Sequence, residues 1–217
     1  MSQDTALREG LLALYRSLNQ HGMMIGSSGN VSARLGSGML ITPTGCDINT
    51  LAASHMVEMS LTGEAVGLRR PSSEWEMHAA IYREHPAAQV IVHTHSDHAT
   101  ALACLNRPLP AFHYNVFTFG GADIRCAPYV TFGTPELAAL AGEAMEGRRA
   151  CLLANHGMIV HGRDVTDALT SALLLEAMCK QYLLTLAAGG PRLLTETEIA
   201  QAIARFGTYG KQPENLS

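Results

Sequence analysis

The sequence predicts an α/β fold: a single-domain, three-layer α/β/α sandwich with one mixed central sheet. Two observations lead to this prediction. Hairpin patterns fill the first third of the chain, and helix and strand patterns alternate in the remainder. The hairpins argue against a purely parallel sheet. The chain has 217 residues and no internal repeat or linker, so we expect one domain over residues 1–217, with an irregular tail from about residue 207.

The first elements expected are one helix and two hairpins. Leucines recur at helical spacing over residues 4–21, which predicts an amphipathic helix. Residues 30–35 and 39–42 flank a glycine-rich turn and predict the first hairpin. Residues 55–60 and 65–67 predict the second hairpin.

The middle of the chain predicts two helices around a buried strand. Ser73 and Glu76 fit a capping box, so a helix should begin there and end near His85. The short apolar run 89–94 predicts a buried strand, and Ser96 is placed to cap the helix that follows.

The last part of the chain alternates strands and helices. Strand patterns occur in three short runs, at residues 124–127, 151–154 and 158–161. Thr134 and Pro135 begin a helix in the favoured way, with proline at the first helical position. A long helix is expected over residues 164–188, and Thr195 and Glu198 fit a capping box for a final helix.

Composition argues against several classes of protein. The formal charge is -4 and no basic run exceeds two residues, so a nucleic-acid partner is not expected. No apolar stretch is long enough to span a membrane, and the N-terminus is polar where a signal peptide would be apolar. The five cysteines contain no C-x-x-C pair, which is typical of reduced thiols in a cytoplasmic protein.

Three histidines could share a metal ion. His93 and His95 end the strand pattern, and residues two apart on a strand project from the same face. Imidazole is a good zinc ligand, although a pair of this kind could equally make ordinary hydrogen bonds. A third ligand could come from His156, where Gly157 lets the backbone turn sharply; taken alone, His156 has the pattern of an ordinary loop residue.

The other histidines are not expected to carry chemistry. Those on helices should be packed or capping residues, namely His78 and His98. Those at the ends of elements should face solvent, namely His21, His55, His85 and His161.

Glu74 is a candidate fourth ligand. A carboxylate in the first turn of a helix could simply favour the helix dipole. Glu76 fits the capping role better, however, which leaves Glu74 without a structural task. A carboxylate beside a metal ion can be a ligand in the resting site and a base during the reaction.

Small polar loops could bind an anion. They offer backbone N–H groups, hydroxyls and one amide, and two of the serines lie at a predicted helix N-terminus. The candidate loops are Ser27-Ser28-Gly29-Asn30, Thr44-Gly45 and Ser72-Ser73. Ordinary turn chemistry explains each loop separately, so the spacing alone does not decide whether they converge.

Taken together, the motifs identify a family resemblance. They occur in the order Gly29-Asn30-Val31-Ser32, Thr42-Pro43-Thr44-Gly45, Pro71-Ser72-Ser73-Glu74-Trp75, His93-x-His95 and Asn155-His156-Gly157. Through them the chain resembles the class II aldolase/adducin family, from about residue 5 to the Thr208-Tyr209-Gly210 tail. The resemblance implies the class II aldolase/adducin fold, with a largely antiparallel central sheet. The chain departs from close aldolase relatives at Asn155, where they often carry histidine.

The resemblance also assigns roles at the site. It implies one zinc ion per subunit bound by His93, His95 and His156, with Glu74 as resting fourth ligand and catalytic acid/base. It implies that six polar loop residues bind a substrate phosphate, namely Gly29, Asn30, Thr44, Gly45, Ser72 and Ser73. Tyr114 becomes the proton donor to the departing aldehyde oxygen, assisted by Tyr209 from a neighbouring subunit of a homotetramer with inter-subunit active sites.

The implied activity is that of a metal-dependent aldehyde-lyase. It would reversibly cleave a ketose 1-phosphate, either L-fuculose 1-phosphate or a 5-substituted ribulose 1-phosphate, into dihydroxyacetone phosphate and an aldehyde. The alternatives within the family are a methylthioribulose-1-phosphate dehydratase, a sugar-acid phosphate decarboxylase and a 4-epimerase. The epimerase is disfavoured because that branch tends to carry aspartate in place of Glu74. A non-catalytic domain like the adducin head is also disfavoured, because such domains lose the metal ligands.

Overall fold

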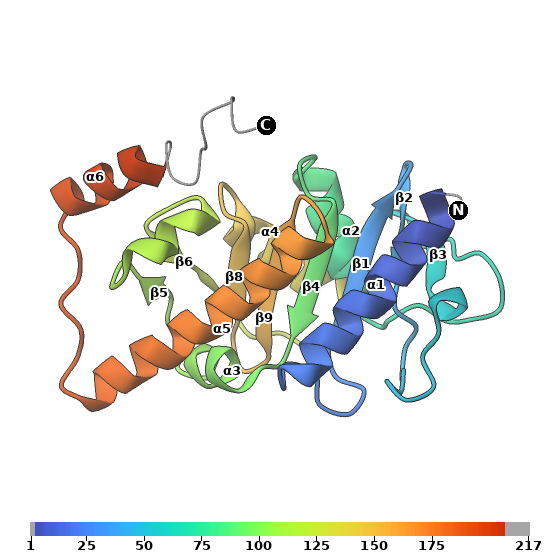
Figure 1. Ribbon diagram of the computed structural model, residues 1–217, viewed down its shortest axis with the longest axis horizontal. Coiled ribbons are helices and arrows are strands. Elements are labelled where there is room, and N and C mark those ends of the chain that lie inside the picture. Colours follow the sequence, from blue (N-terminus) through green and yellow to red (C-terminus); the bar gives the residue numbers. More distant parts are fainter. Residues whose placement is uncertain (1–2, 207–217) are drawn as a thin grey trace, which may run out of the picture.

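A computed structural model describes residues 3–206 of the chain (Figure 1). Its centre is a seven-stranded sheet in the order β3-β2-β1-β4-β9-β8-β7. Every neighbouring pair is antiparallel except β7 and β8, which are parallel. The strands are β1 (Asn30–Leu35), β2 (Gly38–Ile41), β3 (Val57–Ser60), β4 (Val90–Thr94), β7 (Cys126–Ala127), β8 (Ala150–Leu153) and β9 (Gly157–Gly162). The expected mixed, largely antiparallel sheet is confirmed.

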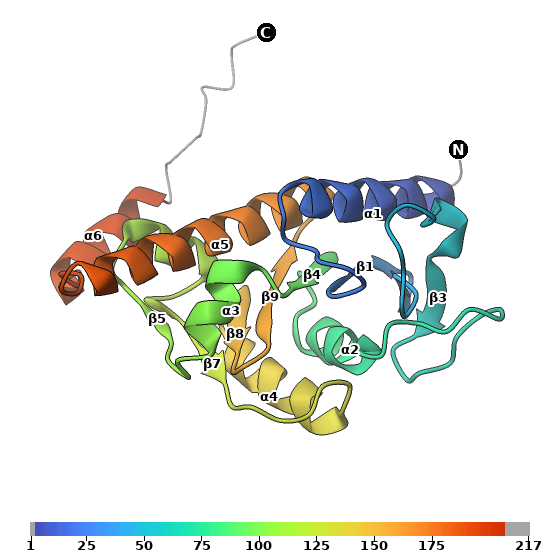
Figure 2. The same ribbon diagram turned by 90° about the horizontal axis from the view of Figure 1, so that it is seen from below.

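Helices cover both faces of this sheet, which confirms the three-layer arrangement (Figure 2). One face carries α1 (Gln3–Gln20), α3 (Asp97–Ala103) and α5 (Val165–Ala187), and the other carries α2 (Trp75–Glu84) and α4 (Pro135–Met145).

The alternation of strand side chains explains the two layers. In β4, Val90 and Val92 pack in the cluster that includes α1 and α5, whereas Ile91 packs in the cluster that includes α2 and α4. Successive side chains of a strand point to opposite faces, so the short apolar run that begins β4 supplies both cores at once.

Two of the strand predictions are partly wrong. The second hairpin loses its return strand, because only Ala65 forms an isolated bridge, to Met59, before the chain leaves the sheet. Residues 124–127 do not form one strand. The segment divides into β6 (Asp123–Ile124), which pairs with β5 (Leu109–Pro110) in a separate small sheet, and β7, which pairs with β8.

Some of the predicted helix caps are confirmed and others are wrong. Thr134 accepts a hydrogen bond from the Leu137 N–H, and Thr195 and Glu198 exchange hydrogen bonds across the first turn of α6 (Glu196–Phe206), as expected. Ser96 occupies the expected cap position of α3, but its side chain accepts no capping hydrogen bond.

The prediction of a capping box at Ser73 and Glu76 is wrong. The residue that precedes α2 is Glu74, and its side chain makes no capping hydrogen bond. Instead, the Ser72 hydroxyl accepts a hydrogen bond from the Glu74 backbone N–H at 3.3 Å. The Glu74 carboxylate is thereby free to turn toward the sheet.

The last helix lies beyond the sheet. Helix α5 is followed by α6, which packs against the short 3-10 helix η2 (Tyr114–Phe119) at one end of the molecule (Figure 1). A second 3-10 helix, η1 (Ala53–His55), precedes β3. Over residues 3–206, no helix combines the length and the apolar character that a membrane span requires. The irregular tail expected from residue 207 lies outside the described residues.

Candidate active site

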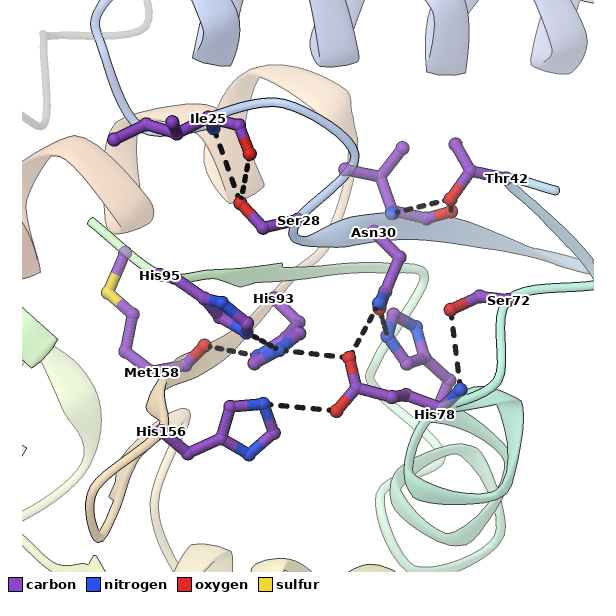
Figure 3. Close-up of polar contacts among 12 residues, drawn as sticks. Ile25, Ser28, Asn30, Thr42, Ser72, His78, His93, His95, His156 and Met158 are labelled. Carbon is purple, nitrogen blue, oxygen red and sulfur yellow. Dashed lines mark hydrogen bonds and ion pairs between the residues drawn. The ribbon is translucent and has the colours of Figure 1, made fainter. Parts of the chain in front are cut away.

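Four side chains from three parts of the chain converge at the end of β4. His93 and His95 come from β4 and its end, His156 from the turn between β8 and β9, and Glu74 from the start of α2. One ligand atom from each lies within 4.8 Å of the others. The Glu74 carboxylate is 3.1 Å from Nε2 of both His93 and His156, and the Nε2 atoms of His93 and His95 are 3.0 Å apart (Figure 3). The sequence-predicted ligands are therefore neighbours in space.

Two glycines allow the backbone to close around these ligands. A Cβ atom on Gly157 would overlap the Thr94 carbonyl oxygen and lie 3.1 Å from the His95 ring. Gly29 has a φ of 77°, and a Cβ there would lie 2.8 Å from the His93 carbonyl oxygen. Both segments approach β4 more closely than a residue with a side chain would permit.

Hydrogen bonding fixes the orientation of His93. Its Nδ1 donates to the Met158 carbonyl oxygen at 2.8 Å, across the β4–β9 pair. With Nδ1 engaged by this carbonyl oxygen, Nε2 is the nitrogen that faces the other three side chains of the cluster. Metal-bound histidines are commonly oriented by such a backbone acceptor.

Glu74 is buried and is held ionised. Burial alone would raise its pKa, but the facing imidazoles of His93 and His156 outweigh that effect and hold the pKa well below its usual range. Asn30 Nδ2 donates to Oε2 at 2.9 Å. No hydrogen bond of good geometry reaches Oε1 from any residue in the described range, although His156 Nε2 lies close to it.

The cluster fits a divalent metal ion. In a tetrahedral zinc site the Zn–N bonds of about 2.1 Å place ligand atoms roughly 3.4 Å apart, close to the spacing here. The buried Oε1 without a donor is the kind of atom that a cation would satisfy. Burial, with the neighbouring His93 and His156, lowers the pKa of His95 to about 4, so its imidazole is neutral and able to act as a ligand.

A cavity of about 290 Å³ opens beside the cluster. Its wall includes Glu74, His95 and His156, and all six residues predicted to bind phosphate: Gly29, Asn30, Thr44, Gly45, Ser72 and Ser73. Three separate polar loops thus face one space, which spacing along the sequence could not reveal.

Some site residues were missed by the sequence reasoning. Tyr129, Val130 and Phe132 form an apolar part of the same cavity wall, on a loop without periodicity that could have marked them. His78 was expected to be a packed residue, and it is fully buried. Its ring is also hydrogen-bonded to Asn30, which in turn donates to Glu74, so only the Asn30 side chain separates the two. His161 was expected to face solvent and is instead buried.

The two predicted tyrosines lie elsewhere. Tyr114 belongs to η2 and is 54% exposed, with its ring 6.1 Å from that of Phe206. It lines a second cavity, next to α6, and is not among the residues that line the site cavity within the described part of the chain. Tyr209 lies outside the described residues.

The fold and the site define an α/β protein with a cluster of three histidines and one glutamate that could hold a metal ion. The chain belongs to the Class II Aldolase and Adducin N-terminal domain family, whose model matches residues 9–183. Within that family it is an enzyme of the aldolase type, a lyase.

Comparisons with individual proteins agree with this assignment. The chain is 45% identical over 205 residues to the 5-methylthioribulose-1-phosphate/5-deoxyribulose-1-phosphate aldolase of Rhodospirillum rubrum, covering 94% of this chain and 93% of that protein. It is 43% identical over 194 residues to the L-fuculose phosphate aldolase of Escherichia coli strain K12, covering 89% and 90%. A solved structure of an L-fuculose 1-phosphate aldolase superposes with a TM-score of 0.89 at 38% identity, covering 95% of this chain and 98% of that one.

Proposed function

We propose that the protein is a zinc-dependent aldolase that reversibly cleaves a ketose 1-phosphate into dihydroxyacetone phosphate and an aldehyde. The observation that carries this proposal is the convergence of Glu74 and three histidines beside one cavity that six polar loop residues also line. The names of the relatives support the same reaction class.

His93, His95, His156 and Glu74 would hold the metal ion, one per subunit. The bound ion would polarise the ketose carbonyl and stabilise the negative charge that develops when the carbon–carbon bond breaks. Zinc is proposed because three imidazoles and one carboxylate suit it; manganese or cobalt can occupy similar ligands.

The polar loops would hold the substrate phosphate. Ser72 and Ser73 lie just before α2, where backbone N–H groups and the helix dipole favour an anion. The loops at Gly29 and Thr44 face the same cavity and add further donors. A phosphate bound there would orient the ketose with its carbon chain directed toward Glu74.

Glu74 would move the proton at C3 of dihydroxyacetone phosphate. In the cleavage direction the carboxylic acid returns a proton to C3, and in the synthetic direction the carboxylate removes it. A carboxylate that is ionised at rest, with one oxygen free of hydrogen-bond donors, is suited to accept that proton.

We further propose that the active enzyme is a homotetramer with sites between subunits. Tyr114 lies away from its own chain's site cavity. Its proposed role is to donate a proton to the aldehyde oxygen in the synthetic direction and to take up the C4 hydroxyl proton in the cleavage direction, and this role requires a second copy of the chain. Tyr209 would assist from the C-terminal tail of a neighbouring subunit.

The substrate screen that tests this function uses L-fuculose 1-phosphate, 5-deoxyribulose 1-phosphate and 5-methylthioribulose 1-phosphate with the zinc-loaded protein. We expect at least one of them to release dihydroxyacetone phosphate, and the aldehyde formed identifies the physiological class. Loss of water or release of carbon dioxide as the main reaction would instead identify a dehydratase or a decarboxylase. Protein purified without chelators that contains no metal would favour a non-catalytic domain.

A further inference from the structure

A chain of buried polar side chains runs from Glu74 into the layer between α2 and the sheet. Asn30 Nδ2 donates to Glu74 Oε2 at 2.9 Å, and Asn30 Oδ1 lies 2.6 Å from His78 Nε2 (Figure 3). His78 Nδ1 lies 2.7 Å from Ser32 Oγ, which lies 2.9 Å from the Tyr82 hydroxyl. All five residues are buried, and none of them is more than 6% exposed.

The register of two elements builds this chain. Glu74, His78 and Tyr82 are spaced by four residues, so they line one face of α2 and its first turn. Asn30 and Ser32 are two apart in β1 and therefore project from the same face of the strand. The helix and the strand supply alternate members of the chain.

The chemistry of these side chains determines which atom donates in each hydrogen bond of the series. An amide oxygen can only accept, so Asn30 Oδ1 requires the hydrogen on His78 Nε2. Burial, with the nearby His93, lowers the pKa of His78 to about 3, so the ring is neutral and its Nδ1 is an acceptor. The Ser32 hydroxyl must then donate to Nδ1. The Tyr82 hydroxyl donates to Ser32 Oγ at 2.9 Å, a shorter contact than the 3.5 Å to the Gln89 carbonyl oxygen. Every donor therefore points toward Glu74.

The opposite orientation of the Asn30 amide is unfavourable. It would aim Oδ1 at the Glu74 carboxylate oxygen, so that two acceptors faced each other 2.9 Å apart, and would leave His78 to accept from the amide. The Glu74 carboxylate thus selects the N–H end of the amide, and His78, with its hydrogen on Nε2, holds the oxygen end.

We propose that His78 is a positioning residue which, supported by Ser32 and Tyr82, holds the Asn30 amide so that it orients the Glu74 carboxylate for metal binding and proton transfer. The proton-transfer part rests on the proposed function. Partners that orient a metal ligand typically contribute 10–100-fold to metal affinity or activity. A merely structural role would instead affect only the packing of α2 on the sheet.

The test compares His78→Leu with His78→Gln. Leucine fills the space without polar atoms, whereas glutamine carries one donor and one acceptor in place of the two ring nitrogens. Zinc affinity is measured by competition with a chromophoric chelator, and exchange of the C3 hydrogen of dihydroxyacetone phosphate with solvent is followed by NMR. We expect His78→Leu to lower zinc affinity and the kcat of exchange by about tenfold or more, with KM within about twofold, and His78→Gln to restore most of both.

His161→Gln is the matched control, because it replaces another buried histidine that lies outside this series of hydrogen-bonded side chains. It should leave zinc affinity and exchange unchanged. Should His78→Leu fail to fold, Ser32→Ala removes the donor to Nδ1 with little change in volume and should weaken both properties severalfold.

The proposal is overturned if folded His78→Leu, or Ser32→Ala in its place, keeps zinc affinity and exchange within twofold of the wild type. It is also overturned if glutamine restores neither property. A wild-type protein that binds zinc but exchanges no hydrogen at C3 would contradict the proposed function alone, because the zinc affinities of the variants still test the role of His78.

Discussion

At the scale of single residues, the metal site is the part that strand geometry made predictable. His93 and His95 are two apart on a strand, and that spacing already placed both rings on one face. Glu74 was singled out for a partly wrong reason. Glu76 was expected to form a capping box with Ser73, which left Glu74 without a structural role, but that capping box does not form. The placement of Glu74 beside the histidines depends on how α2 packs on the sheet, which no local pattern encodes.

Removal of one imidazole ligand should release the metal. We expect His93→Ala to retain less than about a tenth of the zinc of the wild type and to show no detectable cleavage, because three ligands with an open buried position bind weakly. Metal content after gel filtration, measured by atomic emission, checks this result. His98→Ala is a suitable control, since His98 contacts Glu176 and lies outside the cluster. Normal zinc content in His93→Ala would remove His93 from the ligand set.

Glu74→Gln should separate metal binding from proton transfer. Glutamine keeps the shape and one oxygen ligand but cannot accept the C3 proton, so we expect the fold and most of the metal to remain while exchange at C3 falls by about 100-fold or more. The measurement is solvent-hydrogen exchange into dihydroxyacetone phosphate, with zinc content determined on the same sample. Exchange at the wild-type rate would show that another group is the base.

At the scale of elements, the sequence predicted the long and strongly patterned segments best. The helices α1 and α5 and the strands β4, β8 and β9 fall within a residue or two of the expected ranges. The segment around β6 and β7 was missed because four residues were divided between two sheets, and that division depends on tertiary pairing. The cap of α3 was missed for a similar reason, since its acceptor comes from α5, 78 positions further along the chain.

That distant cap gives a pH-dependent prediction. The Glu176 carboxylate accepts hydrogen bonds from the backbone N–H groups of His98 and Ala99 at the start of α3. Burial alone would raise the pKa of Glu176, but these hydrogen bonds outweigh it and lower the pKa. A lowered carboxyl pKa stabilises the fold above the unfolded-state value of about 4.3, and this stabilisation is lost as the pH falls through the lower folded-state value.

We therefore expect Glu176→Gln to lower the free energy of unfolding by about 1 kcal/mol at neutral pH, as for loss of a helix cap. The difference from the wild type should shrink as the pH falls below about 4. Urea unfolding at several pH values measures it. Glu136→Gln, in the exposed first turn of α4 where Thr134 already caps the helix, should change little. An equal loss at every pH would contradict the role given to the charge of Glu176.

At the scale of the whole molecule, one chain supplies the metal cluster and the polar cavity but not all of the proposed catalytic groups. The six phosphate candidates and the four ligands meet within one subunit. Tyr114 instead lies at the end of the molecule that carries η2 and α6. The sequence motifs could identify Tyr114 as a candidate, but in the proposed homotetramer its position relative to a site would depend on how two subunits pack, which no local sequence pattern encodes.

A mixing experiment can decide whether Tyr114 serves a neighbouring site. Glu74→Gln should be inactive because each of its own sites lacks the base, and Tyr114→Phe should lose about 100-fold or more because the aldehyde oxygen lacks its proton donor. When the two variants are unfolded together and reassembled, a site with Glu74 from one chain and Tyr114 from another becomes complete. Random assembly at equal amounts would restore about one quarter of the wild-type activity, if each site uses one neighbour.

The same mixture gives the opposite result if Tyr114 acts within its own chain. Every chain then lacks either Glu74 or Tyr114, so no site is complete and activity stays at the level of the separate variants. Light scattering on the reassembled sample, compared with the 23.2 kDa mass of one chain, establishes whether an oligomer has formed. Recovery of activity in an oligomer of four chains would support both the tetramer and the inter-subunit site. A fully active monomer would exclude them, because Tyr114 cannot then reach a neighbour's cavity.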